Sequence, residues 1–160
     1  MPLPWNEPSE CNDYLAHHVS RVLDSLRRWN GRNLIDPELP IRQQARALFE
    51  APFVVLSHNN DDDPLLNYAN RAGLELFSLT WDELISLPSR LTAEPVHQEE
   101  RARLLAAVAR QGFIDDYRGV RVVKSGRRFV IEQATVWNLF DEKGADYGQA
   151  ATFAHWRFLV

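Results

Sequence analysis

The first apolar pattern along the chain is a stripe at helical spacing near its start. Its members follow one another at intervals of four, three, four and three residues: Leu15, Val19, Val22, Leu26 and Trp29. This spacing predicts an amphipathic helix that begins after an N-cap at Asn12 or Asp13 and ends at Asn30-Gly31. Two heptads are too short for a stable isolated coiled coil, so we expect the domain itself or a partner helix to cover the stripe.

The next segment predicts a second helix and then two strands. Residues 41–50 have amphipathic helical spacing and lie between two prolines, Pro40 and Pro52. From there the pattern changes to short runs typical of strands, at 53–56 and 65–69, which are separated by a polar turn at 59–64.

Helical spacing returns in the middle of the chain. Asn70 is the expected N-cap of a helix over 71–77, and Thr80 with Glu83 has the capping-box pattern for a helix over 81–86. A longer helix is predicted over 96–111, where Gly112 ends the pattern.

The last third of the chain reads as three long strands, 113–123, 128–140 and 147–159. The turns between them contain Gly126 and Gly144, as hairpins require. Two strands, a group of helices and three hairpin-linked strands indicate the α+β class, with helices packed on one face of an antiparallel sheet.

The strand over 128–140 carries apolar residues on both of its predicted faces. Simple alternation places Phe129, Ile131, Gln133, Thr135, Trp137 and Leu139 on one face, and Arg128, Val130, Glu132, Ala134, Val136, Asn138 and Phe140 on the other. A sheet with one face in water would alternate between apolar and polar residues. We therefore expect the central helices to cover one face and the N-terminal helix, or a second subunit, to cover the other.

These patterns divide the chain into three parts. Residues 1–12 form an N-terminal segment that Pro2, Pro4 and Pro8 keep extended. Residues 13–51 form a helical extension, and residues 52–160 form the α+β domain.

Composition and charge narrow the functional classes. The net charge is −4, so the chain lacks the excess of basic residues that tight non-specific nucleic-acid binding needs. The longest apolar run, Leu104 to Ala109, is too short to span a membrane, and no signal peptide is recognisable. The single cysteine, Cys11, excludes an internal disulfide and a Cys-based zinc site. We expect a cytoplasmic domain without a direct nucleic-acid or membrane partner.

Two segments resemble a known family. The run 67–77 (NYANRAGLELF), followed by 80–85 (TWDELI), resembles the strand–helix–helix opening of PAS domains. Together with Gly126-Arg127 and 132–137 (EQATVW), it resembles more narrowly the MEKHLA domain over about residues 14–158. This PAS-related domain occurs as stand-alone bacterial proteins and at the C-terminus of plant class III homeodomain–leucine-zipper transcription factors. The sequence has no homeodomain, zipper or basic region, so we do not expect a transcription-factor role to transfer.

The resemblance implies a five-stranded sheet of spatial order 2-1-5-4-3 that cups a pocket against the helices. It also implies a module that senses a small molecule, redox state or light. Covalent flavin chemistry in the light-sensing branch needs a cysteine beside the pocket; Cys11 lies far upstream, which leaves only non-covalent flavin binding open. Haem-binding members use a histidine near the long helix, where His97 falls, and the alternative is a solvated side chain. The cofactor is therefore unknown.

Polar residues among apolar strand positions are the candidate ligand site. Gln133 and Thr135 alternate with Ile131 and Trp137, and buried polar groups must find partners. The PAS layout adds further residues to a shared pocket, so that the candidates are Asn67, Tyr68, Arg90, Gln133, Thr135 and Trp137. Structural hydrogen bonding is the alternative role for this set.

We therefore expect a non-catalytic PAS-like sensory module that binds a small ligand or a protein partner. Its signal would pass through contacts in a homodimer formed by the N-terminal helix and the sheet face. The alternatives are a structural dimerisation module with a filled core and a small α+β enzyme with a pocket acid or base. The sequence shows no nucleophile–base motif, phosphate loop or metal constellation, which disfavours the enzyme.

Overall fold

An antiparallel sheet of spatial order β2-β1-β5-β4-β3 organises the molecule, which confirms the predicted strand order. The computed structural model describes residues 5–160, so Pro2 and Pro4 lie outside the described residues. The strands are β1 (Val54–His58), β2 (Leu66–Ala69), β3 (Phe113–Val122), β4 (Arg128–Phe140), β5 (Asp146–Phe153) and β6 (His155–Phe158). The helices are η1 (Glu10–Leu15), α1 (Ala16–Asn30), α2 (Ile41–Glu50), α3 (Arg71–Phe77), α4 (Trp81–Ile85), η2 (Ser89–Thr92) and α5 (Pro95–Gln111).

The start of the first helix differs from the prediction. Ser9 caps the short helix η1, and the side chain of Asn12 accepts a hydrogen bond from the Ser9 amide at 2.9 Å. α1 begins only after Leu15, whose backbone is left-handed (φ 56°) and which provides no side-chain cap. The expected cap of α1 at Asn12 or Asp13 is therefore wrong, and η1 begins at Glu10, inside the segment expected to be extended. The predicted end is confirmed, because Gly31 stops α1 with φ 74°.

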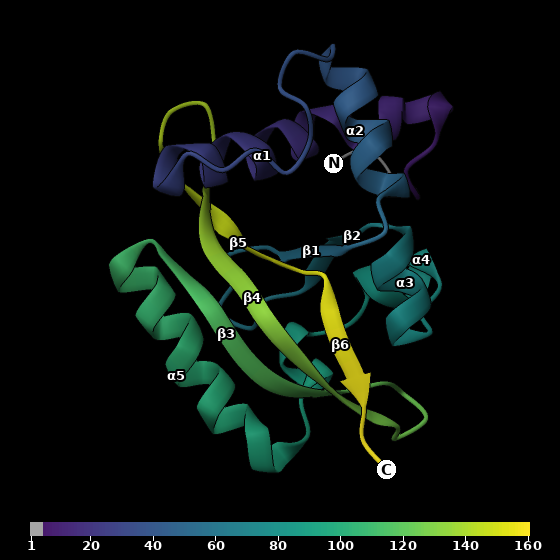
Figure 1. Cartoon of the computed structure of the whole chain (residues 1–160), viewed down its shortest axis with the longest axis vertical. Helices are drawn as coiled ribbons and strands as arrows, with labels where there is room; N and C mark the ends of the chain where they lie inside the picture. The colour runs from purple at the N-terminus through teal and green to yellow at the C-terminus, as the bar shows by residue number, and fades with distance from the viewer. Residues whose placement is uncertain (1–4) are drawn as a thin grey trace.

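α1 covers one face of the sheet with the predicted apolar stripe. Val19, Val22 and Leu26 are fully buried within the single chain. The indole of Trp137 on β4 donates a hydrogen bond to the Val22 carbonyl at 3.1 Å. Figure 1 shows α1 and α2 together at the top of the molecule, whereas α5 lies beside β3 at the lower left. Of the two predicted coverings for the stripe, the structure shows the one within the chain itself.

α3 and α5 pack on the other face, whereas the buried side chains of α4 belong to the cluster that contains the α1 stripe. The caps of α3 and α4 are as predicted. Asn70 caps α3 by accepting a hydrogen bond from the Gly73 amide at 3.1 Å, and it donates to the Leu48 and Phe53 carbonyls. Thr80 and Glu83 form the capping box of α4. Within residues 5–160, no helix is long and apolar enough to cross a membrane.

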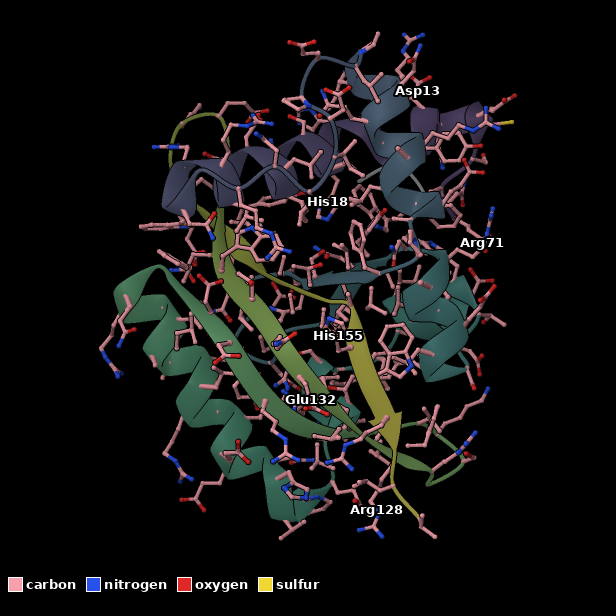
Figure 2. All side chains as sticks on the ribbon, in the orientation of Figure 1. Asp13, His18, Arg71, Arg128, Glu132 and His155 are labelled. Carbon is pink, nitrogen blue, oxygen red and sulfur yellow. The ribbon has the colours of Figure 1, made fainter. Side chains whose placement is uncertain are left out.

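A bulge in β4 changes which residues share a face. Glu132 pairs with His155 of β6, which Figure 2 shows beside it, but the next pair along the ladder is Thr135 with Thr152 of β5. Gln133 lies between them with a left-handed backbone (φ 55°). The predicted strand over 147–159 is accordingly broken at Ala154.

The bulge makes the predicted single face of β4 wrong. An inserted residue reverses the alternation of every side chain that follows it. Phe129 and Ile131 therefore pack with Ala134 against α3. Trp137 and Leu139, which simple alternation places on that same face, pack on the opposite side in the cluster that includes α1.

Candidate functional site

A small cavity lies between α5, η2 and the face of the sheet opposite α1. Its volume is about 50 Å³. Much of its wall is apolar and includes Leu104, Leu105 and Val136. Its polar lining comes from five elements: Ser57 and His58 of β1, Thr92 of η2, Arg101 of α5, Tyr117 and Arg121 of β3, and Gln149 of β5.

Two arginines border this cavity. Arg121 is only 8% exposed; it donates to its neighbouring Val120 carbonyl at 2.8 Å and to the Tyr117 hydroxyl at 3.4 Å. Arg101 is half-buried and donates one hydrogen bond, to the Ser89 hydroxyl at 3.0 Å. Burial, followed by repulsion from Arg121, lowers the pKa of Arg101 to about 10. Arg101 therefore carries its charge beside a second cation, in a partly dehydrated site.

The third polar group is His58, which is 8% exposed. Its Nδ1 lies 2.7 Å from the Asn59 carbonyl, so this nitrogen carries a proton. Its Nε2 is buried and has no hydrogen-bond partner among residues 5–160. Burial is the main cause that lowers the pKa of His58; the hydrogen bond to the Asn59 carbonyl partly opposes it, Arg101 adds to it, and the nearby Gln149 side chain opposes it. A neutral His58 therefore has an unused acceptor nitrogen at the cavity.

Four of the six candidate residues lie on the α1 side of the sheet instead, and three of them, Trp137, Tyr68 and Asn67, lie in or beside the cluster of the α1 stripe. Trp137 and Tyr68 are fully buried there, and burial raises the pKa of Tyr68. The Tyr68 hydroxyl has no partner in the described part of the chain. Asn67 accepts a hydrogen bond from the Ser57 hydroxyl at 2.6 Å.

The other three candidates are separated from one another. Thr135 is buried; it donates to Asp115 at 2.7 Å and accepts from Arg32 at 3.1 Å. Arg90 is exposed and pairs with Asp63. Gln133 is exposed at the bulge. None of the six lines the cavity under α5, so the prediction that they surround one pocket is wrong. For Thr135 and Trp137 the reason is the bulge, which moves them to the opposite face of the sheet. A ligand contact by any one of them stays a prediction.

Sequence reasoning missed the residues that do line the cavity. Arg101 precedes Leu104 by three residues and Val108 by seven, which places it on the buried stripe of α5. Arg121 lies within the apolar run of β3, between Val120 and Val122. A charged residue at an apolar position of each element was the available signal.

The bulge residue itself gives a testable expectation. A left-handed backbone costs a residue with a Cβ about 1–2 kcal/mol, which glycine avoids. Part of this gain is lost because glycine gives the unfolded chain more conformational entropy. We expect Gln133→Gly to raise the free energy of unfolding by about 0.5–1 kcal/mol in urea denaturation. Gln133→Ala, which keeps the Cβ, should change it little. A loss of stability in the glycine variant would show that the Gln133 side chain makes an important contact.

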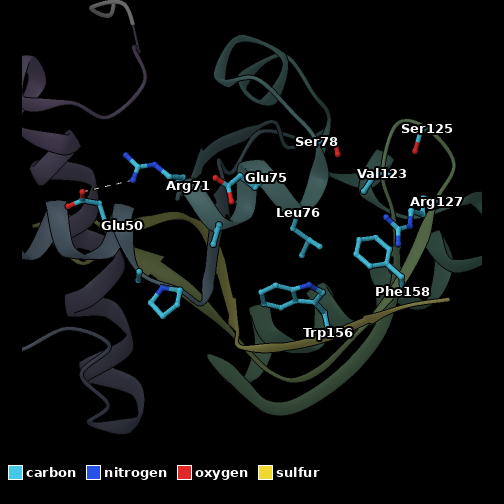
Figure 3. Close-up of a pocket in the computed structure, with 13 residues that line it drawn as sticks. Glu50, Arg71, Glu75, Leu76, Ser78, Val123, Ser125, Arg127, Trp156 and Phe158 are labelled. Atoms are coloured by element: carbon cyan, nitrogen blue, oxygen red, sulfur yellow. Dashed lines mark ion pairs between the residues drawn. The ribbon is translucent and has the colours of Figure 1, made fainter.

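A larger groove of about 620 Å³ is open at the surface between α3, the β3–β4 hairpin and β6 (Figure 3). Trp156 and Phe158 form its apolar floor, and Arg127 stacks over the Phe158 ring at 3.6 Å. Its charged side chains are exposed, and Arg71 lies 4.0 Å from Glu50. Because water already solvates these charges, they do not need a ligand of opposite charge to neutralise them.

The cavity under α5 does not fit a flavin or a haem. Pockets that enclose cofactors measure about 300–1,000 Å³, several times the volume found here. Cys11 is exposed on η1, and His97 lies in the first turn of α5 without lining the cavity. Within the described chain, no group of three or more His, Cys, Asp or Glu side chains is arranged to hold a metal ion.

Comparison with known proteins agrees with this architecture. The homeobox-leucine zipper protein ATHB-9 of Arabidopsis thaliana is 29% identical over 99 residues, which are 60% of this chain and 11% of that protein. The chain thus spans about a tenth of the length of this relative. A PAS domain of a protein from Colwellia psychrerythraea has a TM-score of 0.62 at 17% identity, covering 74% of this chain and 96% of that one. The light-state dimer of the fungal blue-light photoreceptor Vivid has a TM-score of 0.56 at 16% identity, covering 84% and 90%.

At these identities the structures establish the fold. The family follows from the sequence, because the model of the MEKHLA domain matches residues 16–158 and so includes both α1 and α2. This chain therefore belongs to the MEKHLA domain family and has the fold of a PAS domain.

Proposed function

We propose that this chain is a non-catalytic sensory module that binds a small ligand in the cavity under α5. The bound state passes through the sheet to α1 and changes the contacts that this helix and the sheet face make with a second copy of the chain. The chain resembles PAS domains, which are sensory modules, and this resemblance supports a regulatory rather than a catalytic role.

One observation carries the proposal: β1 touches the cavity on one face and holds α1 on the other. His58 lines the cavity. The preceding residue, Ser57, also borders the cavity, but its hydroxyl oxygen lies 2.9 Å from Nε2 of His18 on α1. Consecutive strand residues point to opposite faces. A ligand that moves His58 therefore also moves the hydrogen bond that anchors α1.

The dimer contacts follow from what α1 covers. Trp137 and Leu139 are fully buried in the cluster that also contains the α1 stripe. If α1 shifts, these apolar side chains are uncovered, and a second copy of the chain offers the matching surface. A ligand needs to favour the shifted state by only a few kcal/mol to change its population.

Filling the cavity tests the ligand site. Ala151 lines the cavity from β5, and valine adds two methyl groups at a strand position that suits β-branched residues. We expect native mass spectrometry of the untagged protein to show a retained small molecule that is reduced at least about tenfold in Ala151→Val, since overpacking costs about 1–3 kcal/mol. Hydrogen exchange of α1 should change together with this loss.

The matched control is Ala106→Val, at an exposed position of α5. It should keep both the retained mass and the exchange rate of α1. A wild-type chain that carries no molecule, together with unchanged exchange of α1 in Ala151→Val, would instead support the structural module with a filled core.

A further inference from the structure

We propose that the ligand of this cavity is a small hydroxycarboxylate of two or three carbons, held by Arg101, Arg121 and His58. This inference rests on the proposed function, because it specifies the ligand of the same site. It starts from a charge imbalance that no residue of the described chain corrects.

The imbalance is a pair of cations without an anion. Neither Arg101 nor Arg121 forms an ion pair with a carboxylate anywhere in residues 5–160, whereas most of the arginines at the surface do. The lining contains no aspartate or glutamate. A guanidinium has five N–H donors and does not lose its proton in proteins, so the cost of burying it cannot be relieved by titration. An anion in the cavity relieves that cost for both arginines.

The hydrogen bonds already formed leave most of these donors free. Arg101 uses one N–H group, and Arg121 uses two, one of them in a long contact with Tyr117. Arginine forks match the two oxygens of a carboxylate, and the resulting charge-assisted bonds are about twice as strong as neutral ones. The cavity is thus supplied with donors for an oxyanion.

The rest of the wall favours a carboxylate over an inorganic oxyanion. Leu104, Leu105, Val136 and Ala151 offer no hydrogen bond. Phosphate would present oxygen atoms to these side chains and leave them without donors. A short hydrocarbon portion attached to a carboxylate satisfies the apolar wall and the arginines together.

His58 adds the hydroxyl group. Its Nδ1 proton is bonded to the Asn59 carbonyl, so its free Nε2 is an acceptor in the neutral ring. Burial, helped by the nearby Arg101, lowers the pKa of His58 against the smaller opposing effects of Asn59 and Gln149, and so favours the neutral ring. A neutral acceptor calls for a donor on the ligand, and a hydroxyl group supplies one.

The size of the cavity limits the carbon chain. One water needs about 10–15 Å³ of such volume, so a cavity of about 50 Å³ holds about four water-sized groups. Covalently bonded atoms lie closer together than separate waters, so this room suits a molecule of about five or six heavy atoms.

The test is isothermal titration of the full chain with sodium lactate, propionate and phosphate. The buffer contains neither carboxylate nor phosphate, and sodium chloride keeps the ionic strength constant. We expect saturable binding of lactate, with propionate about 3- to 10-fold weaker because it lacks the hydroxyl group. Arg101→Met and Arg121→Lys should each weaken lactate binding by at least about tenfold.

The control is Arg103→Met, which removes the same charge from an exposed position of the same helix, where Arg103 pairs with Glu99. It should bind lactate as the wild type does. Arg101→Met should also keep or raise the melting temperature without ligand, since it removes an uncompensated charge. An unchanged or higher melting temperature would show that misfolding does not cause the loss of lactate binding in Arg101→Met.

Three results would overturn the inference. They are tighter binding of phosphate than of lactate, equal binding of lactate and propionate, and lactate binding that survives both arginine substitutions. A chain that retains a different molecule in native mass spectrometry but ignores lactate would refute this ligand and leave the sensory function intact.

Discussion

The Leu26→Asp variant is expected to lose at least about 4 kcal/mol of its free energy of unfolding, which leaves most small domains largely unfolded at 25 °C. Leu26 lies on the face of α1 that packs against the sheet, and it is fully buried. The change removes its packing and places a carboxylate inside an apolar cluster. Circular dichroism and urea denaturation measure the loss.

The matched control is Leu91→Asp, the same substitution at a leucine that is 44% exposed. It should cost less than about 1 kcal/mol. Light scattering then separates the two coverings that the sequence left open. A Leu26→Asp chain that stays folded but changes from dimer to monomer would show that the stripe is an intermolecular surface, contrary to the structure.

The stability of the wild-type chain is expected to fall by about 2 kcal/mol between pH 7 and pH 5 because of His18 alone. Burial, followed by the charges of Arg21 and His17, lowers the pKa of His18 from 6.5 to about 3. Between these two values the unfolded chain binds a proton that the folded chain does not. Stability is therefore complete above pH 6.5 and decreases steadily as the pH falls toward 3.

The surroundings of His18 explain why the folded ring stays neutral (Figure 2). Its Nε2 lies 2.9 Å from Ser57 Oγ and its Nδ1 lies 3.0 Å from the Tyr147 hydroxyl. The Ser57 hydroxyl donates its own hydrogen bond to Asn67, so it accepts from Nε2 of His18, and Nδ1 accepts from Tyr147, as in neutral imidazole. A second proton would break this arrangement.

His18→Gln tests the assignment, since an amide supplies a donor and an acceptor but does not titrate in this range. The variant should lose most of the slope between pH 7 and 5, and a smaller slope of the same sign should remain from His58, whose pKa is also lowered. His17→Gln changes an exposed neighbour and should keep the slope. The carboxyl groups of Glu83 and Glu142 have lowered pKa values, so their stabilisation is lost only below about pH 4.5, outside this window. An unchanged slope in His18→Gln would refute the role of His18.

Local patterns predicted the elements well because their causes are local. The capping box of Thr80 and Glu83, the cap at Asn70 and the stop at Gly31 each involve residues within a few positions of one another. The cap at Asn12 failed because three consecutive residues, Asp13 to Leu15, adopt left-handed backbone conformations that no local preference favours.

The candidate site was predicted poorly because it depends on one bulge and on contacts between distant strands. Alternation along β4 was extrapolated through Gln133, and every assignment beyond it was reversed. Arg101 and Arg121 are twenty residues apart in the chain, and only the packing of α5 on β3 brings them to one cavity.

The sequence by itself determined the family, the order of the elements and the apolar stripe of α1, since these depend on residue spacing and on motifs that lie close together in the chain. The tertiary structure alone decided that the stripe covers the chain's own sheet, that β4 reverses its faces at Gln133, and that two arginines share a cavity without an acid. These features depend on which side chains meet across the sheet. Spacing along the chain cannot specify such meetings, because a single inserted residue exchanges the two faces of a strand.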